Sequence, residues 1–163
     1  MCIRDSLSTD INVLPKAADS VFHGDHDIVI GSRLLKESRV ERRTLIRTIM
    51  SWSYSFLFRL LFFVSFKDAQ CGFKVLTRPV ADFIVPVVKD TGWFFDTELL
   101  ILAEKNGFGI VEIPVLWIDD PDSRVKIFKT AWEDLKGLFR LRFGGLAKAR
   151  DTIIETRFRE KLK

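Results

Sequence analysis

The chain has 163 residues, of which 47% are hydrophobic and 29% charged, and its formal net charge is +4. This length suits one domain with a real core, and this composition excludes a disordered or low-complexity protein. Two cysteines without metal-ligand spacing exclude a disulfide framework and a zinc site, and they indicate a reducing compartment.

Basic residues concentrate toward the C-terminal end of the chain. From Ser123 onward lie 12 of the 26 Lys/Arg residues but 5 of the 22 Asp/Glu residues, a local charge of +7. Such an end suits an anionic partner, such as phosphate groups or an anionic membrane, and it equally suits a solvated charged tail. A nucleic-acid partner is not expected, because no motif interleaves exposed aromatic and basic residues.

The chain begins with an irregular stretch and a predicted helix. Residues 1–6, MCIRDS, show no periodicity and lead into no element, which is typical of a non-native scar. Ser8 or Thr9 is expected to cap a helix over 12–22, where apolar residues repeat on one side. No strand precedes this helix, so we expect the chain to be the second part of a larger α/β unit.

A strand is predicted next. The apolar run DIVIGSR, residues 27–33, contains a glycine near its end and predicts a buried strand that leads into a loop. Arg33 would then lie at the carboxyl end of a strand, where α/β proteins bind their ligands. Residues 36–43, KESRVERR, are expected to be a polar connector.

The segment 44–66 predicts a long and very apolar helix. Its last 18 residues contain one charge, Arg59, and this length is close to that of a membrane span. A mid-segment arginine and several serines argue against spanning. Two interpretations stay open: one or two amphipathic helices lying partly in the bilayer interface, with Arg42, Arg43 and Arg47 facing headgroups, and an ordinary core helix.

A polar segment, KDAQCGFKVL at residues 67–76, follows this apolar helix. Asp68 is a candidate base or metal-adjacent ligand, Gln70 can donate and accept hydrogen bonds, and Gly72 allows close approach to the backbone. A short strand is expected over 72–78. An ordinary loop between a helix and a strand has the same composition, so this alternative stays open.

Two helices and one strand are predicted in the next part of the chain. A helix begins at proline and spans about 79–85, and a second helix spans 98–106 and ends at Gly107. The alternating run over 109–119 predicts a strand. Pro114 marks that strand as an edge, because proline donates no hydrogen bond to a sheet.

Two acids lie at the start of the predicted helix. Asp96 is expected to cap the helix, with Glu98 in its first turn. Residues two apart on a helix point in different directions, so the two acids are not expected to form a paired-carboxylate site.

The last part of the chain combines a loop with helices. The loop DDPDSR leads into an amphipathic helix over 126–143. Ser123, Arg124 and Lys126 combine a hydroxyl, a guanidinium and an ammonium group, which suits the binding of phosphate. Residues 144–163 predict a charged helical tail with little capacity to form a core.

Strands alternate with helices, so the fold class is α/β. The order DIVIGSR, then KDAQCGFKVLTR, then WFFDTELLILAEKNGFGIVEIPVLWIDDPDSRVKI resembles the C-terminal half of family 2 glycosyltransferases that make polyprenyl-phosphate sugars, such as dolichyl-phosphate glucose and mannose synthases. The resemblance covers 7–143. It implies the acceptor-side half of a GT-A fold, a Rossmann-like sheet with amphipathic interfacial helices.

The resemblance also implies a reaction and a metal. The family transfers a hexose from a UDP- or GDP-sugar to a lipid phosphate with inversion, using Mg²⁺ or Mn²⁺ held by an Asp-x-Asp motif. The matching positions here are Arg4, Asp5 and Ser6, so no metal ligands are expected to be retained and this chain alone is expected to be inactive. The full-length parent is expected to bind the metal.

The resemblance assigns roles to residues of this chain. Asp68 and Gln70 match a motif near the reacting groups, and Arg33 matches an arginine that binds phosphate. Ser123, Arg124 and Lys126 match a loop that closes over the diphosphate. The residues that match a signature shaping the acceptor site are Trp93, Phe95, Asp96 and Glu98.

The partners implied are a nucleotide-sugar donor, a polyprenyl-phosphate acceptor and a membrane surface, with the protein peripheral on the cytoplasmic face of the membrane. The alternative is a basic, amphipathic module that binds membranes without catalysis.

Overall fold

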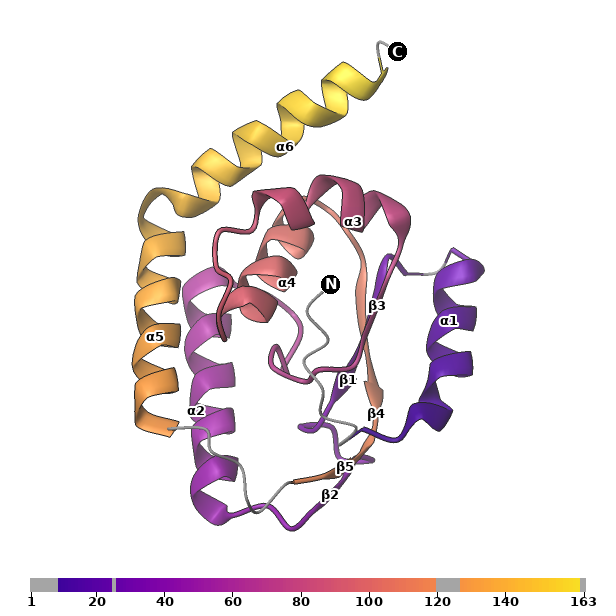
Figure 1. The fold of residues 1–163 in the computed structure, drawn as a ribbon, viewed down its shortest axis with the longest axis vertical. Coiled ribbons are helices and arrows are strands. Elements are labelled where there is room, and N and C mark those ends of the chain that lie inside the picture. Colours follow the sequence, from indigo (N-terminus) through magenta and orange to yellow (C-terminus); the bar gives the residue numbers. More distant parts are fainter. Residues whose placement is uncertain (1–8, 25, 120–126, 162–163) are drawn as a thin grey trace.

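The computed structural model describes residues 9–24, 26–119 and 127–161. The chain folds into helices and short strands that alternate along the sequence (Figure 1). The elements in chain order are η1 (Ile11–Val13), α1 (Leu14–Phe22), β1 (Ile28–Ser32), β2 (Arg39–Glu41), α2 (Leu45–Phe62), β3 (Lys74–Leu76), α3 (Arg78–Phe83), η2 (Val85–Val87), α4 (Phe95–Lys105), β4 (Ile110–Pro114), β5 (Leu116–Ile118), α5 (Ile127–Arg140), η3 (Leu141–Gly145) and α6 (Leu146–Lys161).

A three-stranded sheet in the order β3-β1-β4 forms the centre of the fold. β1 pairs in parallel with β4 and antiparallel with β3. Helix α1 covers one face of this sheet, and α4 and α2 lie on the other side (Figure 1). The predicted α/β class is therefore confirmed, and it is compatible with part of a GT-A fold.

β1 is buried along its whole length because it has a hydrophobic cluster on each face. Val29 packs with Ala17 of α1, whereas Ile28 and Ile30 point into the main core. This alternation follows from the two-residue period of a strand. The predicted strand is confirmed, and Arg33, which follows its carboxyl end, lies nearly buried.

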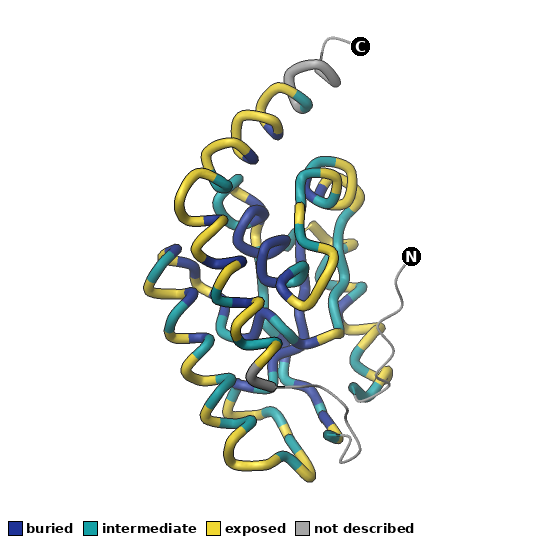
Figure 2. The backbone as a smooth tube through the Cα atoms, turned by 60° about the vertical axis from the view of Figure 1, so that its left-hand side comes forward, coloured by how far each residue is buried: buried dark blue, intermediate teal, exposed yellow. Residues whose placement is uncertain are grey.

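α4 is the most completely buried helix of the described chain. Every residue from Thr97 to Ala103 is buried, and Figure 2 shows this helix at the centre of the molecule. α4 begins three residues earlier than predicted, and Phe94 occupies its N-cap position without a side-chain hydrogen bond. The expectation that Asp96 caps this helix is therefore wrong, since the carboxylate already lies in the first turn.

A second sheet of two parallel strands, β2 and β5, lies beside the first. The predicted connector over 36–43 therefore contains a strand, and the predicted strand over 109–119 divides at Val115 into β4 and β5. β4 lies at an edge of the three-stranded sheet, which confirms the role expected of Pro114.

α2 has a core-facing side and a solvent-facing side. Thr44 accepts a hydrogen bond from the backbone of Arg47 and caps the helix, and Phe63 ends it in a left-handed conformation. Phe58 and Phe62 are buried in the main core. The opposite side carries an exposed apolar stripe, formed by Leu45, Ile49, Trp52, Phe56, Leu60 and Phe63.

Two expectations about α2 are resolved in part. Within the described residues, no helix is both long and apolar enough to cross a bilayer. Arg47 does not face outward, because its Nη1 lies 2.8 Å from Asp119 in an ion pair. Arg43 donates hydrogen bonds to the Arg47 carbonyl and the Ser51 hydroxyl. Arg43 and Arg47 are thus partly buried, and Arg42 is the exposed one of the three arginines.

The C-terminal helices pack on the core more closely than predicted. α5 runs beside α2, and the chain turns at Gly144, whose φ of 117° suits glycine (Figure 1). α6 then crosses the end of the molecule with Ala149 and Ile153 buried in the main core. The expectation that this tail has little capacity to form a core is therefore wrong. At the other end, Asp10 caps η1 in place of the predicted Ser8 or Thr9.

Candidate functional site

Arg33 and Asp68 form the centre of the candidate site. The guanidinium donates from Nε to Asp68 Oδ2 at 2.8 Å and from Nη2 to Oδ1 at 2.8 Å, and the Arg33 backbone N–H donates to Oδ2 at 2.9 Å. Both side chains are nearly buried. The end of β1 and the polar segment, 35 residues apart, are therefore joined by a bidentate ion pair.

Each group of this pair stabilises the charge on the other. Burial raises the pKa of a carboxyl, but the charge and hydrogen bonds of Arg33 outweigh burial and hold the pKa of Asp68 below its ordinary value. Burial likewise lowers the pKa of Arg33, while Asp68 raises it to a net value above the ordinary one. Both groups are charged at neutral pH, and Asp68 is a weak base.

Two further side chains hold the pair in place. The Arg33 guanidinium lies over the ring of Trp117 in β5, 4.9 Å from the ring centroid. Glu112 of β4 accepts a hydrogen bond from the backbone N–H of Asp68 at 3.0 Å. Both sheets therefore contribute to the orientation of the arginine.

Side chains of the polar segment contact two helices, α5 and α4. Gln70 donates from its backbone to Asp68 Oδ1 at 3.2 Å, and from Nε2 to Asp134 of α5 at 2.7 Å. Lys74 lies 3.3 Å from Asp96 of α4 and also donates to the backbone carbonyl of Cys71. Among the acids of the predicted acceptor-site signature, Asp96 is thus the one that reaches the polar segment.

The rest of that signature lies elsewhere. Glu98 is buried and accepts hydrogen bonds from the Asp90 backbone at 3.0 Å and from Arg140 Nη2 at 2.6 Å, so it joins a loop to α5. Phe95 packs against the main core, and Trp93 is 43% exposed. Asp96 and Glu98 have different partners, which confirms that they do not form a paired-carboxylate site. Whether these residues shape an acceptor site stays a prediction.

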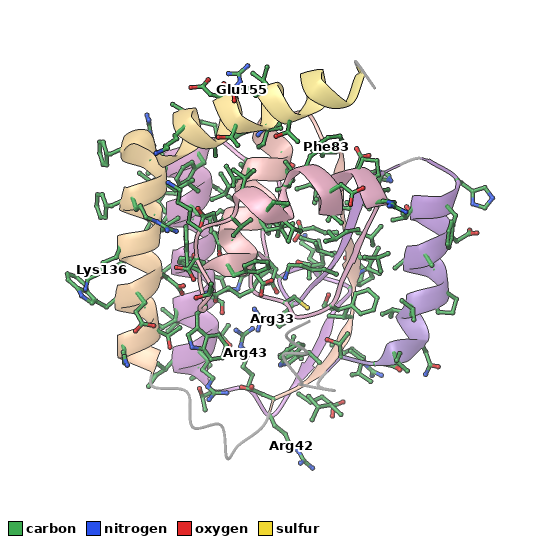
Figure 3. All side chains as sticks on the ribbon, turned by 45° about the horizontal axis from the view of Figure 1, so that its top comes forward. Arg33, Arg42, Arg43, Phe83, Lys136 and Glu155 are labelled. Atoms are coloured by element: carbon green, nitrogen blue, oxygen red, sulfur yellow. The ribbon has the colours of Figure 1, made fainter. Side chains whose placement is uncertain are left out.

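Arg43 is a second cation near Arg33, and one of the two interpretations of the sequence had it face lipid headgroups. Burial, with the charge of Arg33, lowers the pKa of Arg43, so the two guanidinium groups are close enough to repel. Figure 3 shows Arg33 and Arg43 near each other, whereas Arg42 projects away from the body of the molecule. Sequence gave no signal to separate Arg42 from Arg43. The Asp68 carboxylate acts electrostatically on both guanidinium groups, and the net positive charge of the three groups can attract an anion.

Three predicted phosphate-binding residues, Ser123, Arg124 and Lys126, lie outside the described residues, as do Arg4 and Ser6. Among the residues that the structure describes, no group of three His, Cys, Asp or Glu side chains could hold a metal ion. Each Asp68 oxygen already accepts two hydrogen bonds. The described residues therefore do not fit a divalent cation.

Comparison with known proteins identifies relatives of this chain. It is 35% identical over 123 residues to glycosyltransferase AglD of Haloferax volcanii, an alignment that covers 76% of this chain and 20% of the relative. It is 32% identical over 136 residues to a dolichyl-phosphate beta-glucosyltransferase of Dictyostelium discoideum, covering 82% of this chain and 42% of the relative. These relatives, both named as glycosyltransferases, confirm the predicted resemblance to family 2 of the glycosyltransferases.

A third relative is the dolichyl-phosphate beta-glucosyltransferase of Saccharomyces cerevisiae, which is 34% identical over 102 residues. This alignment covers 61% of the present chain and 30% of the relative. No protein-family model matches the chain. The chain thus spans less than half the length of the relatives that it matches. The predicted resemblance is confirmed, and these relatives are all named as glycosyltransferases, whereas the division into 1–6, 7–143 and 144–163 stays a prediction.

Proposed function

We propose that the protein containing this chain transfers a hexose from a nucleotide-sugar to a polyprenyl phosphate, and that this chain binds the acceptor phosphate. The observation that carries the proposal is the Arg33–Asp68 ion pair at the carboxyl end of β1, with Arg43 beside it. Ligands of α/β sheets bind at this end of the strands. Relatives named as dolichyl-phosphate glucosyltransferases support a lipid phosphate as the acceptor.

The chemistry of a phosphate acceptor agrees with this arrangement. The second pKa of a phosphate monoester is about 6, so its oxygen is an anionic nucleophile at neutral pH without a strong base. The difficulty is to bring this anion to the diphosphate of the donor, which requires cations at fixed positions. Asp68 would fix Arg33 in one orientation, and Arg33 and Arg43 would bind the phosphate for an inverting displacement at the anomeric carbon.

The exposed apolar stripe of α2 supports a position at a membrane surface. Its six side chains are between 51% and 81% exposed. Trp132 and Phe139 are exposed on α5 beside it, and Phe143 is exposed on η3. Large apolar and aromatic side chains with nearby cations are typical of helices that lie in the bilayer interface. A prenyl chain bound there would bring its phosphate toward the candidate site.

The test compares two adjacent arginines in the complete protein that contains this sequence. Transfer of labelled sugar from UDP-glucose and from GDP-mannose to dolichyl phosphate is measured. Arg43→Ala is expected to raise the KM for dolichyl phosphate about tenfold or more, because a charge-assisted hydrogen bond to phosphate is lost. Arg42→Ala, the matched control, is expected to change it less than about twofold.

A second variant tests the role of Asp68. Asp68→Asn is expected to lower turnover about a hundredfold, because a neutral amide no longer holds the Arg33 guanidinium in a bidentate pair. Wild-type kinetics in both Asp68→Asn and Arg43→Ala would contradict the proposal. Binding to vesicles without any sugar transfer by the complete protein would favour the membrane module without catalysis.

A further inference from the structure

Asp134 is a buried carboxylate on the core-facing side of α5. Its side chain is 3% exposed, and it lies one helical turn before Leu138 and two turns before Leu141, both buried in the main core. An apolar side chain is normal at such a position, because burial of a carboxylate carries a high desolvation cost unless it is hydrogen-bonded. A carboxylate kept at this position calls for an explanation beyond packing.

The structure gives Asp134 a partner in the candidate site. Its Oδ2 accepts a hydrogen bond of 2.7 Å from Gln70 Nε2, across 64 residues of sequence. The backbone N–H of the same glutamine donates to Asp68 Oδ1 at 3.2 Å. Gln70 is therefore held at two points, with its backbone fixed by the Arg33–Asp68 pair and its side chain fixed by α5.

This contact also determines which end of the amide faces the site. An ionised carboxylate can only accept hydrogen bonds, so the glutamine must turn its NH₂ group toward Asp134 and its carbonyl oxygen Oε1 away from it. Neither an apolar side chain nor a second amide at position 134 would impose this orientation. Asp134 thus converts an amide with two possible orientations into a fixed hydrogen-bond acceptor.

We propose that Asp134 is a positioning residue that presents Gln70 Oε1 to a hydroxyl group of the transferred sugar. The proposal rests on the proposed function, because it assumes that a sugar enters beside the Arg33–Asp68 pair. Under this proposal α5 has two roles. Its outer side exposes Trp132 and Phe139, and Asp134 on its buried side binds the site residue Gln70.

The main test is kinetic and uses the complete protein. Asp134→Ala is expected to lower kcat about tenfold while the KM for dolichyl phosphate stays within about twofold, because the phosphate is bound by the arginines. Asp134→Asn is expected to be intermediate, since an asparagine accepts from Gln70 in only one of its two orientations. The matched control is Glu133→Ala on the same helix, where an exposed glutamate lies 3.8 Å from Lys129.

An exchange of partners separates positioning from a purely structural role. Gln70→Glu alone places two carboxylates together, so it is expected to lower kcat and Tm more than Asp134→Ala or Asp134→Asn does. Adding Asp134→Asn restores the hydrogen bond, with the asparagine amide at position 134 as donor and the carboxylate at position 70 as acceptor. Position 70 again presents an oxygen to the site, so kcat and Tm are both expected to recover. The recovery of kcat is the informative readout, because a structural contact would restore Tm alone.

The outcomes distinguish this proposal from the function on which it rests. An active wild type with an unchanged kcat in Asp134→Ala overturns the positioning role alone. A double variant that regains Tm without regaining kcat also overturns it. A wild-type protein that transfers no sugar overturns the proposed function, and the positioning role with it.

Discussion

Asp68 accepts four hydrogen bonds, two at each oxygen. Oδ2 accepts from the Arg33 backbone and Nε, and Oδ1 accepts from Arg33 Nη2 and the Gln70 backbone. A carboxylate bonded in this way in its charged form is a poor proton acceptor, because protonation would break these bonds. It is well suited to hold a guanidinium at a fixed position. The site therefore fits an acceptor that is already ionised better than a neutral hydroxyl acceptor.

This geometry predicts how the stability of the protein depends on pH. Because the pKa of Asp68 is lower in the folded state, its contribution to the free energy of unfolding is complete above the ordinary aspartate pKa of about 3.9 and is lost as pH falls through the lower folded value. Urea unfolding from neutral pH to about pH 3 should therefore show a steeper loss of stability in wild type than in Asp68→Asn. Equal slopes for the two proteins would contradict the prediction.

At this scale the sequence identified Arg33, Asp68 and Gln70 as candidates but not their contacts with one another. Arg43 was grouped with Arg42 and Arg47 as a candidate membrane-facing residue and not assigned to the site. The left-handed backbone at Arg42, which separates the two arginines, cannot be recognised from residue types. Asp134 did carry a signal. It falls four residues before Leu138 on the predicted apolar face of a helix, where a charge is unexpected.

Helix α5 approaches the start of α4 closely because Gly137 has no side chain. A Cβ atom at this position would lie 2.4 Å from the Phe94 ring, closer than any real contact. Phe94 is buried, and the Arg140 guanidinium lies 5.9 Å from its ring centroid. The position of α5, and with it the position of Asp134, depends on this contact between glycine and an aromatic ring.

Gly137→Ala is therefore expected to destabilise the protein although alanine is the better helix former. The intrinsic gain for alanine in a helix is about 1 kcal/mol, whereas overpacking in a core costs about 1–3 kcal/mol. The difference leaves a net loss of up to about 2 kcal/mol, so we expect the free energy of unfolding in urea to fall by about 1 kcal/mol. Gly109→Ala is the control, since its Cβ would meet its nearest neighbour at 3.8 Å. A stabilised Gly137→Ala would show that α5 can shift without cost.

The elements that sequence predicted best are those with long, regular patterns. β1 and α2 have continuous apolar runs, and α5 has a clear 3.6-residue period. β2 was missed and β5 was not separated from β4, because strands of three residues are too short to show alternation. α6 was misjudged because two buried residues, Ala149 and Ile153, fasten a helix whose composition is otherwise polar. The pairing of β1 with β4 joins residues 82 positions apart, so it cannot be predicted from a local sequence pattern.

The molecule as a whole has two differing outer sides. α1 covers one face of the central sheet, while α2 and α5 form the outer side beyond the other face (Figure 1). The apolar stripe of α2 runs the length of that helix, and Figure 2 shows exposed residues recurring along both helices. The sequence left open whether the segment 44–66 forms an interfacial helix or a core helix. In the structure, α2 has one side in the core and an exposed apolar side opposite to it.

Binding to vesicles tests which side of the molecule meets a membrane. Phe56→Ser in the apolar stripe is expected to weaken binding to anionic lipid vesicles on the order of tenfold, the effect of removing one buried phenylalanine. Phe22→Ser is the matched control, because Phe22 is 86% exposed on α1 and Phe56 is 69% exposed. Co-sedimentation measures both. Equal losses in the two variants would contradict an oriented interface.

The stacking of Arg33 on Trp117 gives the site an optical readout. Trp117 is 8% exposed, whereas the other three tryptophans of the chain, Trp52, Trp93 and Trp132, are between 43% and 61% exposed. Emission that iodide cannot quench therefore comes mainly from the indole beneath the guanidinium. An anion that draws the arginine from this ring changes the shielded fluorescence, so occupancy can be followed without a label and without turnover.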